Sequence, residues 1–178
     1  DKKFISIETL SGIKYLTLQV AGGKVKTVTV DMGQAKAEKP INLAVDGETV
    51  SLIPVSVGNP HAVIFVDDIE KAPLTKLGPI IEHHEAFPDG VNVEFVEVLG
   101  ADKLRMRVWE RGSGVTMACG TGACASVMAA IAAKFCHYDE TVSVLLDGGT
   151  LKIQIAPDNT VQMTGPAETV YEGETEIC

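Results

Sequence analysis

The chain has 178 residues, of which 46% are hydrophobic and 22% are charged, and its formal net charge at pH 7 is −9. This length suits one medium globular domain, or one domain and part of a second. The acidic balance and the lack of any basic run argue against a nucleic-acid or anionic-membrane partner. The longest apolar stretch, 123–133, is too short to span a bilayer.

Most of the chain predicts short strands, because apolar and polar residues alternate with period two between turn residues. Asp46-Gly47 is a typical hairpin tip, and the AGGK segment at 21–24 predicts another tight turn. The predicted strands are 14–20, 25–32, 61–68, 91–100, 103–109 and 160–165, with hairpins over 41–57 and 142–155.

Two helices are predicted between these strands. The first lies within 72–87, and we expect Gly78-Pro79 to kink or restart it. The second runs from about Thr121 to Phe135 and is apolar on every face, so it must be buried on every face. The predicted fold is therefore α+β: a curved, mostly antiparallel sheet or barrel wrapped around a central hydrophobic helix.

Cys119 and Gly120 lie at the start of that helix. Unpaired backbone N–H groups and the helix dipole attract negative charge there, which predicts a lowered thiol pKa and a resting place for an anionic ligand group. Thr121 can add a hydroxyl. The alternative is an ordinary helix cap beside an inert cysteine. Cys124 and Cys136 have apolar neighbours and are interpreted as buried small hydrophobes, which favours a reducing, cytoplasmic compartment.

Further polar residues fall at predicted strand ends, where binding and catalytic sites are often built. Asn59 and His61 come just before a buried strand, Asn92 begins another, and Glu110-Arg111 follows a third in a glycine-rich loop. Each has a structural alternative. The asparagines could form turns, the histidine could be a satisfied core residue, and the Glu-Arg pair could be solvated.

Three segments, SVGNPHAVIFVDD, FPDGVNVEFVEV and RVWERGSGVTMACGTGACA, resemble successive signature segments of the diaminopimelate epimerase family. The ending MTGPAETVYEG is also similar, and the resemblance extends from about Val30 to Gly165. It implies a fold of two similar halves, each a curved sheet around a central helix, with the active site in the cleft between them. This chain would supply one half of that pseudo-symmetric enzyme.

The resemblance implies cofactor-independent and metal-independent interconversion of LL- and meso-2,6-diaminopimelate. One cysteine thiolate removes the α-proton while a thiol on the opposite face delivers another. Carried over motif by motif, Cys119 is one of the two thiols, and His61 and Glu110 tune the proton transfers. The implied substrate-binding residues are Asn59, Asn92, Glu110, Arg111, Gly120 and Thr121.

The family's other cysteine lies in a CGNG-like segment that this sequence lacks. We therefore expect a C-terminal portion of the enzyme, inactive alone, whose partner is the missing N-terminal half; the intact enzyme would be a homodimer. The expected division is 1–20 as a remnant of the N-terminal domain, 21–164 as the C-terminal epimerase domain, and 165–178 as a segment returning toward the N-terminal domain.

Three alternatives stay open. A Cys-His hydrolase would use Cys119 as nucleophile and His61 as base. A proline or hydroxyproline racemase could use the same fold, and a non-catalytic binding module would bind a ligand without exchanging its α-proton.

Overall fold

The computed structural model describes residues 2–10 and 12–176. In chain order its elements are β1 (Phe4–Thr9), β2 (Gly12–Ala21), β3 (Lys24–Gln34), β4 (Lys36–Ala37), β5 (Ile41–Val45), β6 (Glu48–Ser56), β7 (Pro60–Phe65), the 3-10 helix η1 (Ile69–Lys71), α1 (Leu74–Glu82), β8 (Asn92–Gly100), β9 (Lys103–Glu110), β10 (Gly114–Thr116), α2 (Gly120–Ala132), β11 (Thr141–Leu146), β12 (Gly149–Ile155) and β13 (Thr160–Pro166). Every strand predicted from the sequence is present, and the β5–β6 hairpin turns at Asp46-Gly47 as predicted.

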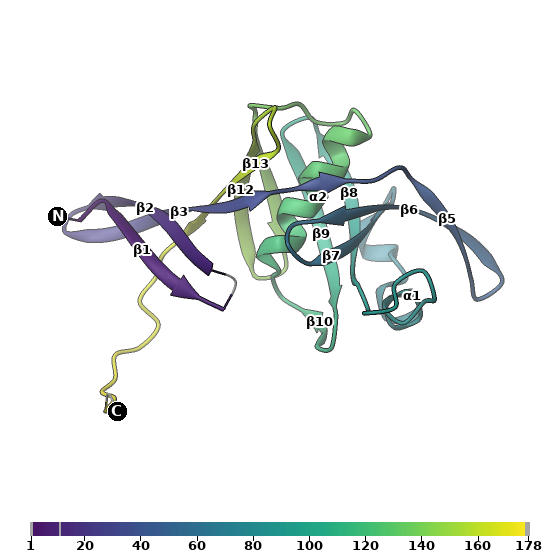
Figure 1. Cartoon of the computed structure of the whole chain (residues 1–178), viewed down its shortest axis with the longest axis horizontal. Helices are drawn as coiled ribbons and strands as arrows, with labels where there is room; N and C mark the ends of the chain where they lie inside the picture. The colour runs from purple at the N-terminus through teal and green to yellow at the C-terminus, as the bar shows by residue number, and fades with distance from the viewer. Residues whose placement is uncertain (1, 11, 177–178) are drawn as a thin grey trace.

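The strands form one sheet in the order β1-β2-β3-β13-β12-β11-β9-β8-β7-β6-β4, with β10 beside β9 and β5 beside β6. Its pairings are antiparallel except for β7 with β8 and β9 with β11. β1, β2 and the first part of β3 project from the body as an arm, and the chain after β13 extends away without a helix or strand through 176 (Figure 1).

The sheet curves around α2, which contacts eight strands: β4, β6, β7, β8, β9, β11, β12 and β13. Every residue from Gly122 to Ile131 is buried, and the helix forms the centre of the larger apolar core. Its alanines keep the surrounding strands close. The predicted all-apolar helix inside a mostly antiparallel sheet is therefore confirmed, although it ends at Ala132 rather than near Phe135.

A second apolar core lies on the other side of the sheet, beneath α1. Successive side chains of a strand point to opposite faces, and on β7 Val63 joins the α2 core while Ile64 joins the α1 core. β7 is thus buried on both faces.

The helix does not restart at Gly78-Pro79, because α1 runs as one helix from Leu74 to Glu82 with Pro79 inside it. The helix is held by its packing on Trp109 of β9. A Cβ on Gly78 would lie 2.6 Å from Cγ of Trp109, so only glycine lets the two elements approach this closely. Within the described residues, no helix is long and apolar enough to cross a membrane.

Candidate active site

Cys119 is the N-cap residue of α2, with extended backbone angles of φ −139° and ψ 111°. Its Sγ accepts a hydrogen bond from the backbone N–H of Gly122 at 3.3 Å and lies 3.6 Å from Oγ1 of Thr121. Gly120 and Thr121 form the first turn and are half-buried, whereas Cys119 is 8% exposed. The sulfur therefore takes the capping position that a serine or aspartate oxygen usually occupies.

The pKa of Cys119 is raised to about 11, and the lowered pKa predicted from the helix N-terminus is wrong. Burial is the largest cause, because it removes water from the thiolate. Hydrogen bonds from Thr121 and from the Gly122 N–H lower the pKa, but the nearby carboxylates of Glu94 and Glu110 raise it again. The sequence located the helix start but not the depth of the sulfur or these two charges.

A chain of hydrogen bonds leads from this thiol into the core. Nδ2 of Asn59 donates to Oγ1 of Thr121 at 3.3 Å, and Oδ1 of Asn59 lies 3.0 Å from Nε2 of His61. Nδ1 of His61 lies 2.7 Å from Oε1 of Glu94, and both of these side chains are completely buried. Both ring nitrogens of His61 are thus engaged by side chains other than Cys119.

Asn92 links two of the predicted segments. Its Nδ2 donates to the carbonyl of Pro60 at 2.9 Å, and its Oδ1 accepts from the backbone N–H of Arg111 at 3.0 Å. The guanidinium of Arg111 donates to the carbonyl of Asp89 at 2.9 Å. In this structure the amide of Asn92 is therefore used by the protein itself, at the point where three chain segments meet.

Glu110 ends β9 and accepts a hydrogen bond from the hydroxyl of Thr116 on β10. The loop between them is fixed by the buried side chain of Glu82 on α1. Oε1 of Glu82 accepts from the backbone N–H of Gly112 at 2.7 Å, and Oε2 accepts from Nε1 of Trp109 at 2.6 Å. These contacts hold Glu110 and Arg111 at the end of the strand.

The structure gathers the predicted site residues into two neighbouring groups. Asn59, His61, Cys119 and Thr121 form the hydrogen-bonded chain, with Gly120 in the same helical turn. Asn92, Glu110 and Arg111 lie on adjacent strand ends and are joined to the first group through the pairing of β7 with β8. Sequence reasoning missed two buried acids, Glu82 and Glu94.

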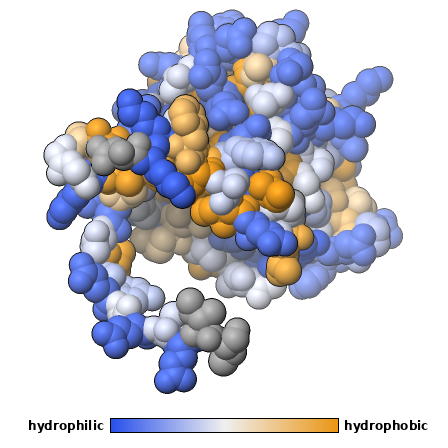
Figure 2. All heavy atoms as spheres, turned by 60° about the vertical axis from the view of Figure 1, so that its left-hand side comes forward, coloured by the Kyte–Doolittle hydropathy of each residue, from blue (hydrophilic) through white to orange (hydrophobic). Residues whose placement is uncertain are grey.

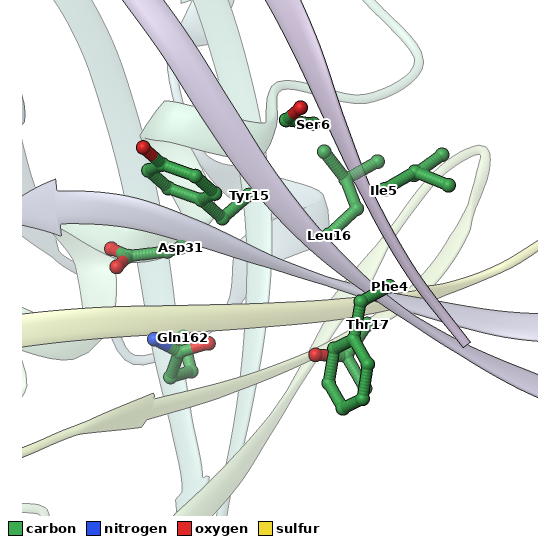
Figure 3. Close-up of a pocket in the computed structure, with 8 residues that line it drawn as sticks. All are labelled: Phe4, Ile5, Ser6, Tyr15, Leu16, Thr17, Asp31 and Gln162. Carbon is green, nitrogen blue, oxygen red and sulfur yellow. The ribbon is translucent and has the colours of Figure 1, made fainter. Parts of the chain in front are cut away.

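A pocket of about 350 Å³ lies beside the first group. Its lining includes Asn59, Pro60, His61 and Phe87. A second pocket, of about 440 Å³, lies on the arm, where Phe4, Tyr15, Asp31 and Gln162 surround it (Figure 3); none of the predicted site residues lines it. Apolar surface is exposed beside this arm (Figure 2). Among the described residues, no group of three His, Cys, Asp or Glu side chains could hold a metal ion.

Several solved structures share this fold at low sequence identity. A hydroxyproline epimerase from Agrobacterium vitis superposes with a TM-score of 0.73 at 16% identity, covering 92% of this chain and 56% of that one. A probable proline racemase from Agrobacterium radiobacter K84 gives 0.71 at 14% identity, covering 95% and 61%. A PhzF-family phenazine biosynthesis protein from Bacillus anthracis gives 0.67 at 12% identity, covering 92% and 64%. The chain therefore has the fold seen in these proline racemase-type and PhzF-family structures.

The sequence comparisons are more specific. A family profile described as diaminopimelate epimerase matches residues 53–170. The diaminopimelate epimerase of Geobacillus thermodenitrificans is 50% identical over 188 aligned positions, covering 97% of this chain and 64% of the relative. That of Phocaeicola vulgatus is 50% identical over 191 positions, covering 99% and 67%. The chain belongs to the diaminopimelate epimerase family, and it spans about 64% of the length of the Geobacillus relative.

Proposed function

We propose that this chain supplies one of the two acid/base thiols, Cys119, for the interconversion of LL- and meso-2,6-diaminopimelate. The observation that carries the proposal is the setting of this sulfur, which caps α2 and lies at the end of a hydrogen-bonded chain of three other predicted site residues. Family membership supplies the substrate class, since relatives of about 50% identity are named diaminopimelate epimerases.

In the proposed reaction a thiolate on one face of the α-carbon takes its proton, and a thiol on the other face returns a proton with inverted configuration. With a pKa near 11, Cys119 is a thiol in the resting site, which supports its starting as the proton donor. After donation it is a thiolate and serves as the base in the reverse direction. The α-carbanion between the two steps needs donors on the substrate carboxylate, for which the N–H groups of Gly120 and Thr121 in the first turn of α2 are suited.

The second thiol is assigned to a segment outside this chain. Cys124 is completely buried inside α2, and Cys136 follows that helix and is 2% exposed; Cys178 lies outside the described residues. The proposal includes that the N-terminal half closes the cleft, that 1–20 and 165–178 belong to its side of the enzyme, and that the complete protein is a cytoplasmic homodimer.

The remaining assignments follow the same logic. Arg111 and Asn59 would bind polar groups of the substrate, while Glu110, whose carboxylate raises the pKa of Cys119, would tune that thiol. Asn92 would position Arg111 by accepting a hydrogen bond from its backbone N–H. His61 would act on Cys119 through Asn59 and Thr121, because it has no direct bond to the sulfur among the contacts of its two nitrogens.

The test is α-proton exchange of LL-diaminopimelate in deuterated water, with the stereochemistry of the product read at the same time. The chain is assayed alone and together with the N-terminal third of the Geobacillus relative. We expect deuterium at the α-carbon and conversion to the meso form only in the mixture. Net conversion by the chain alone would contradict the two-thiol mechanism.

Two further arms separate the alternatives. Turnover of proline or hydroxyproline in place of diaminopimelate would indicate the racemase, and an acyl-enzyme trapped on Cys119 would indicate the hydrolase. Ligand binding without exchange in the mixture would indicate a binding module.

A further inference from the structure

Glu94 is a completely buried acid in the apolar core around α2. It lies on β8 two residues from Val96, so both face the same side of the strand, where Val96 packs in the α2 core. Within the described part of the chain, Oε2 of Glu94 has no hydrogen-bond partner. A buried carboxyl group with an unsatisfied oxygen is costly, and an apolar side chain at this position would avoid that cost. Its presence calls for a role beyond packing.

The bonds of Asn59 determine the proton on the neighbouring imidazole. Because Asn59 uses Nδ2 to donate to Thr121, it presents Oδ1 to His61, and only a protonated Nε2 can donate to that oxygen. One further proton then lies between Nδ1 of His61 and Oε1 of Glu94, 2.7 Å apart. The hydrogen bond of Glu94 to Nδ1 thus holds the imidazole of His61 in the orientation in which Nε2 donates to Asn59.

The direction of the hydrogen bonds from His61 to Thr121 decides whether the Thr121 hydroxyl can donate to the sulfur of Cys119. Since the hydroxyl of Thr121 accepts from Asn59, its own proton is free to be donated to Sγ of Cys119 at 3.6 Å. If the Nε2 proton were lost, the amide of Asn59 would turn to donate to the ring, and its oxygen would then accept the Thr121 proton. The thiolate would lose the hydroxyl donor of Thr121 and keep only the backbone N–H of Gly122.

The packing brings the same carboxyl group close to the thiol. A Cβ on Gly122 would lie 2.8 Å from Oε1 of Glu94 and 3.2 Å from Sγ of Cys119. The carboxylate oxygen and the sulfur are therefore both packed against the backbone of Gly122. The titratable groups around the thiol are Glu94 on β8, Glu110 on β9, Cys124 on α2 and, through Asn59, His61 on β7.

We propose that Glu94 is a positioning residue of this site: by its hydrogen bond to Nδ1 of His61 it orients the donors of His61, Asn59 and Thr121 toward the sulfur of Cys119. The inference rests on the proposed role of Cys119 as an acid/base thiol. Glu94 does not touch substrate, and its effect passes through the three side chains between.

The test compares Glu94→Gln with Glu94→Leu, two neutral replacements of similar size. Both remove the direct charge of Glu94 from the sulfur, but only glutamine can hydrogen-bond to Nδ1. The measurement is the rate of iodoacetamide alkylation of Cys119 on the folded chain between pH 7 and pH 10, with fragment ions separating Cys119 from Cys124. We expect Glu94→Leu to be alkylated about threefold or more slowly than Glu94→Gln at each pH, because it loses the oriented donor to the thiolate.

The same pair is then measured in a Thr121→Val background, which lacks the terminal donor. We expect the difference between Leu and Gln to vanish there, since the effect of Glu94 passes through Thr121. Equal rates for Gln and Leu, or a difference that persists without the Thr121 hydroxyl, would overturn the proposal. Matched controls are Glu97→Gln and Glu97→Leu on the same strand, where the carboxylate binds the N–H of Ile69 instead; both should react like the unmodified chain.

If the leucine variant does not fold, the unmodified chain still decides. The proposal requires a proton on Nε2 of His61, which ¹⁵N resonances of the ring report directly, and a bare Nε2 would overturn it. Neither readout needs diaminopimelate. A coupled site without α-proton exchange would therefore remove the proposed function alone, and exchange without coupling would remove only the role of Glu94.

Discussion

The backbone N–H of Arg111 donates to the side-chain oxygen of Asn92 at 3.0 Å, and this bond joins the loop after β9 to the start of β8. The other end of the same amide donates to the carbonyl of Pro60 at the start of β7. One buried side chain therefore fixes the relative positions of three segments that carry predicted site residues.

Replacing Asn92 with aspartate should weaken this junction. Aspartate can accept from Arg111 but has no donor for the Pro60 carbonyl, so two acceptors face each other in a buried place. We expect a loss of about 1–3 kcal/mol in the free energy of unfolding, measured by urea denaturation at pH 7. Asn42→Asp on β5, where the side chain is exposed, is the control, and an equal effect of both changes would argue against the junction.

Glu82 should make stability depend on acid pH. Its pKa is lowered from the ordinary 4.5, chiefly by the hydrogen bond from Trp109, with the Gly112 N–H adding to the effect. A carboxyl group whose folded pKa is depressed stabilises the folded state above its unfolded pKa, and that stabilisation is lost as the pH falls through the folded pKa.

The corresponding variant is Glu82→Gln. Its side chain keeps one acceptor oxygen, but its NH₂ group would face one of the two N–H donors, Nε1 of Trp109 or the backbone N–H of Gly112. We expect it to be less stable than the unmodified chain by about 1–3 kcal/mol at pH 7, with the two curves converging below the folded pKa of Glu82. Urea midpoints from pH 2.5 to 7, followed by the fluorescence of the single tryptophan, provide the measurement. Parallel curves over the whole range would show that Glu82 makes no ionic contribution.

Gly122→Ala should be poorly tolerated although alanine favours helices. The new Cβ would meet Oε1 of Glu94 at 2.8 Å and Sγ of Cys119 at 3.2 Å, in a buried region that cannot readily expand. We expect a loss of about 1–3 kcal/mol from overpacking, seen as a lower thermal midpoint. Gly120→Ala is the comparison, because its Cβ would meet only the flexible end of Met163 at 3.1 Å. A larger loss at Gly120 than at Gly122 would contradict this packing.

The raised pKa of Cys119 predicts the shape of its reactivity profile. Because the thiolate is scarce until about pH 11, alkylation of Cys119 should still be increasing between pH 9 and pH 10. Cys119 should nevertheless react before Cys124 and Cys136, which are 0% and 2% exposed. A rate that levels off below pH 8 would restore the low pKa expected from the helix N-terminus alone.

The strands and the buried helix could be predicted because their sequence signals are local. These signals are the alternation of apolar and polar residues, the turn residues, and a helical segment that is apolar on every face. The sequence also placed the candidate site residues at polar strand ends, and the structure brings these residues into two neighbouring groups. The role of Glu94 was hidden for a physical reason. In the alternating segment 91–100 a glutamate suggests a solvated face, but α2 covers that face, so Glu94 is buried beside His61.

The thiol pKa was mispredicted in a similar way. A helix N-terminus can be located from Cys119 and the glycines after it, but burial and the charges of Glu94 and Glu110 arise from strands far away in the sequence. Asn92 shows the same limit, since turn former and ligand-binding residue look alike until its partners, Pro60 and Arg111, are known.

The central claim is that Cys119 exchanges a proton with the α-carbon of diaminopimelate. Its most direct test is the Cys119→Ser variant, mixed with the N-terminal third of the Geobacillus relative and assayed for α-deuterium uptake from deuterated water, with Cys136→Ser as the matched control. Loss of about a hundredfold or more of the rate is predicted for Cys119→Ser, because a hydroxyl replaces the acid/base thiol, and an unchanged rate is predicted for Cys136→Ser. Uptake by Cys119→Ser at the rate of the unmodified chain would contradict the account.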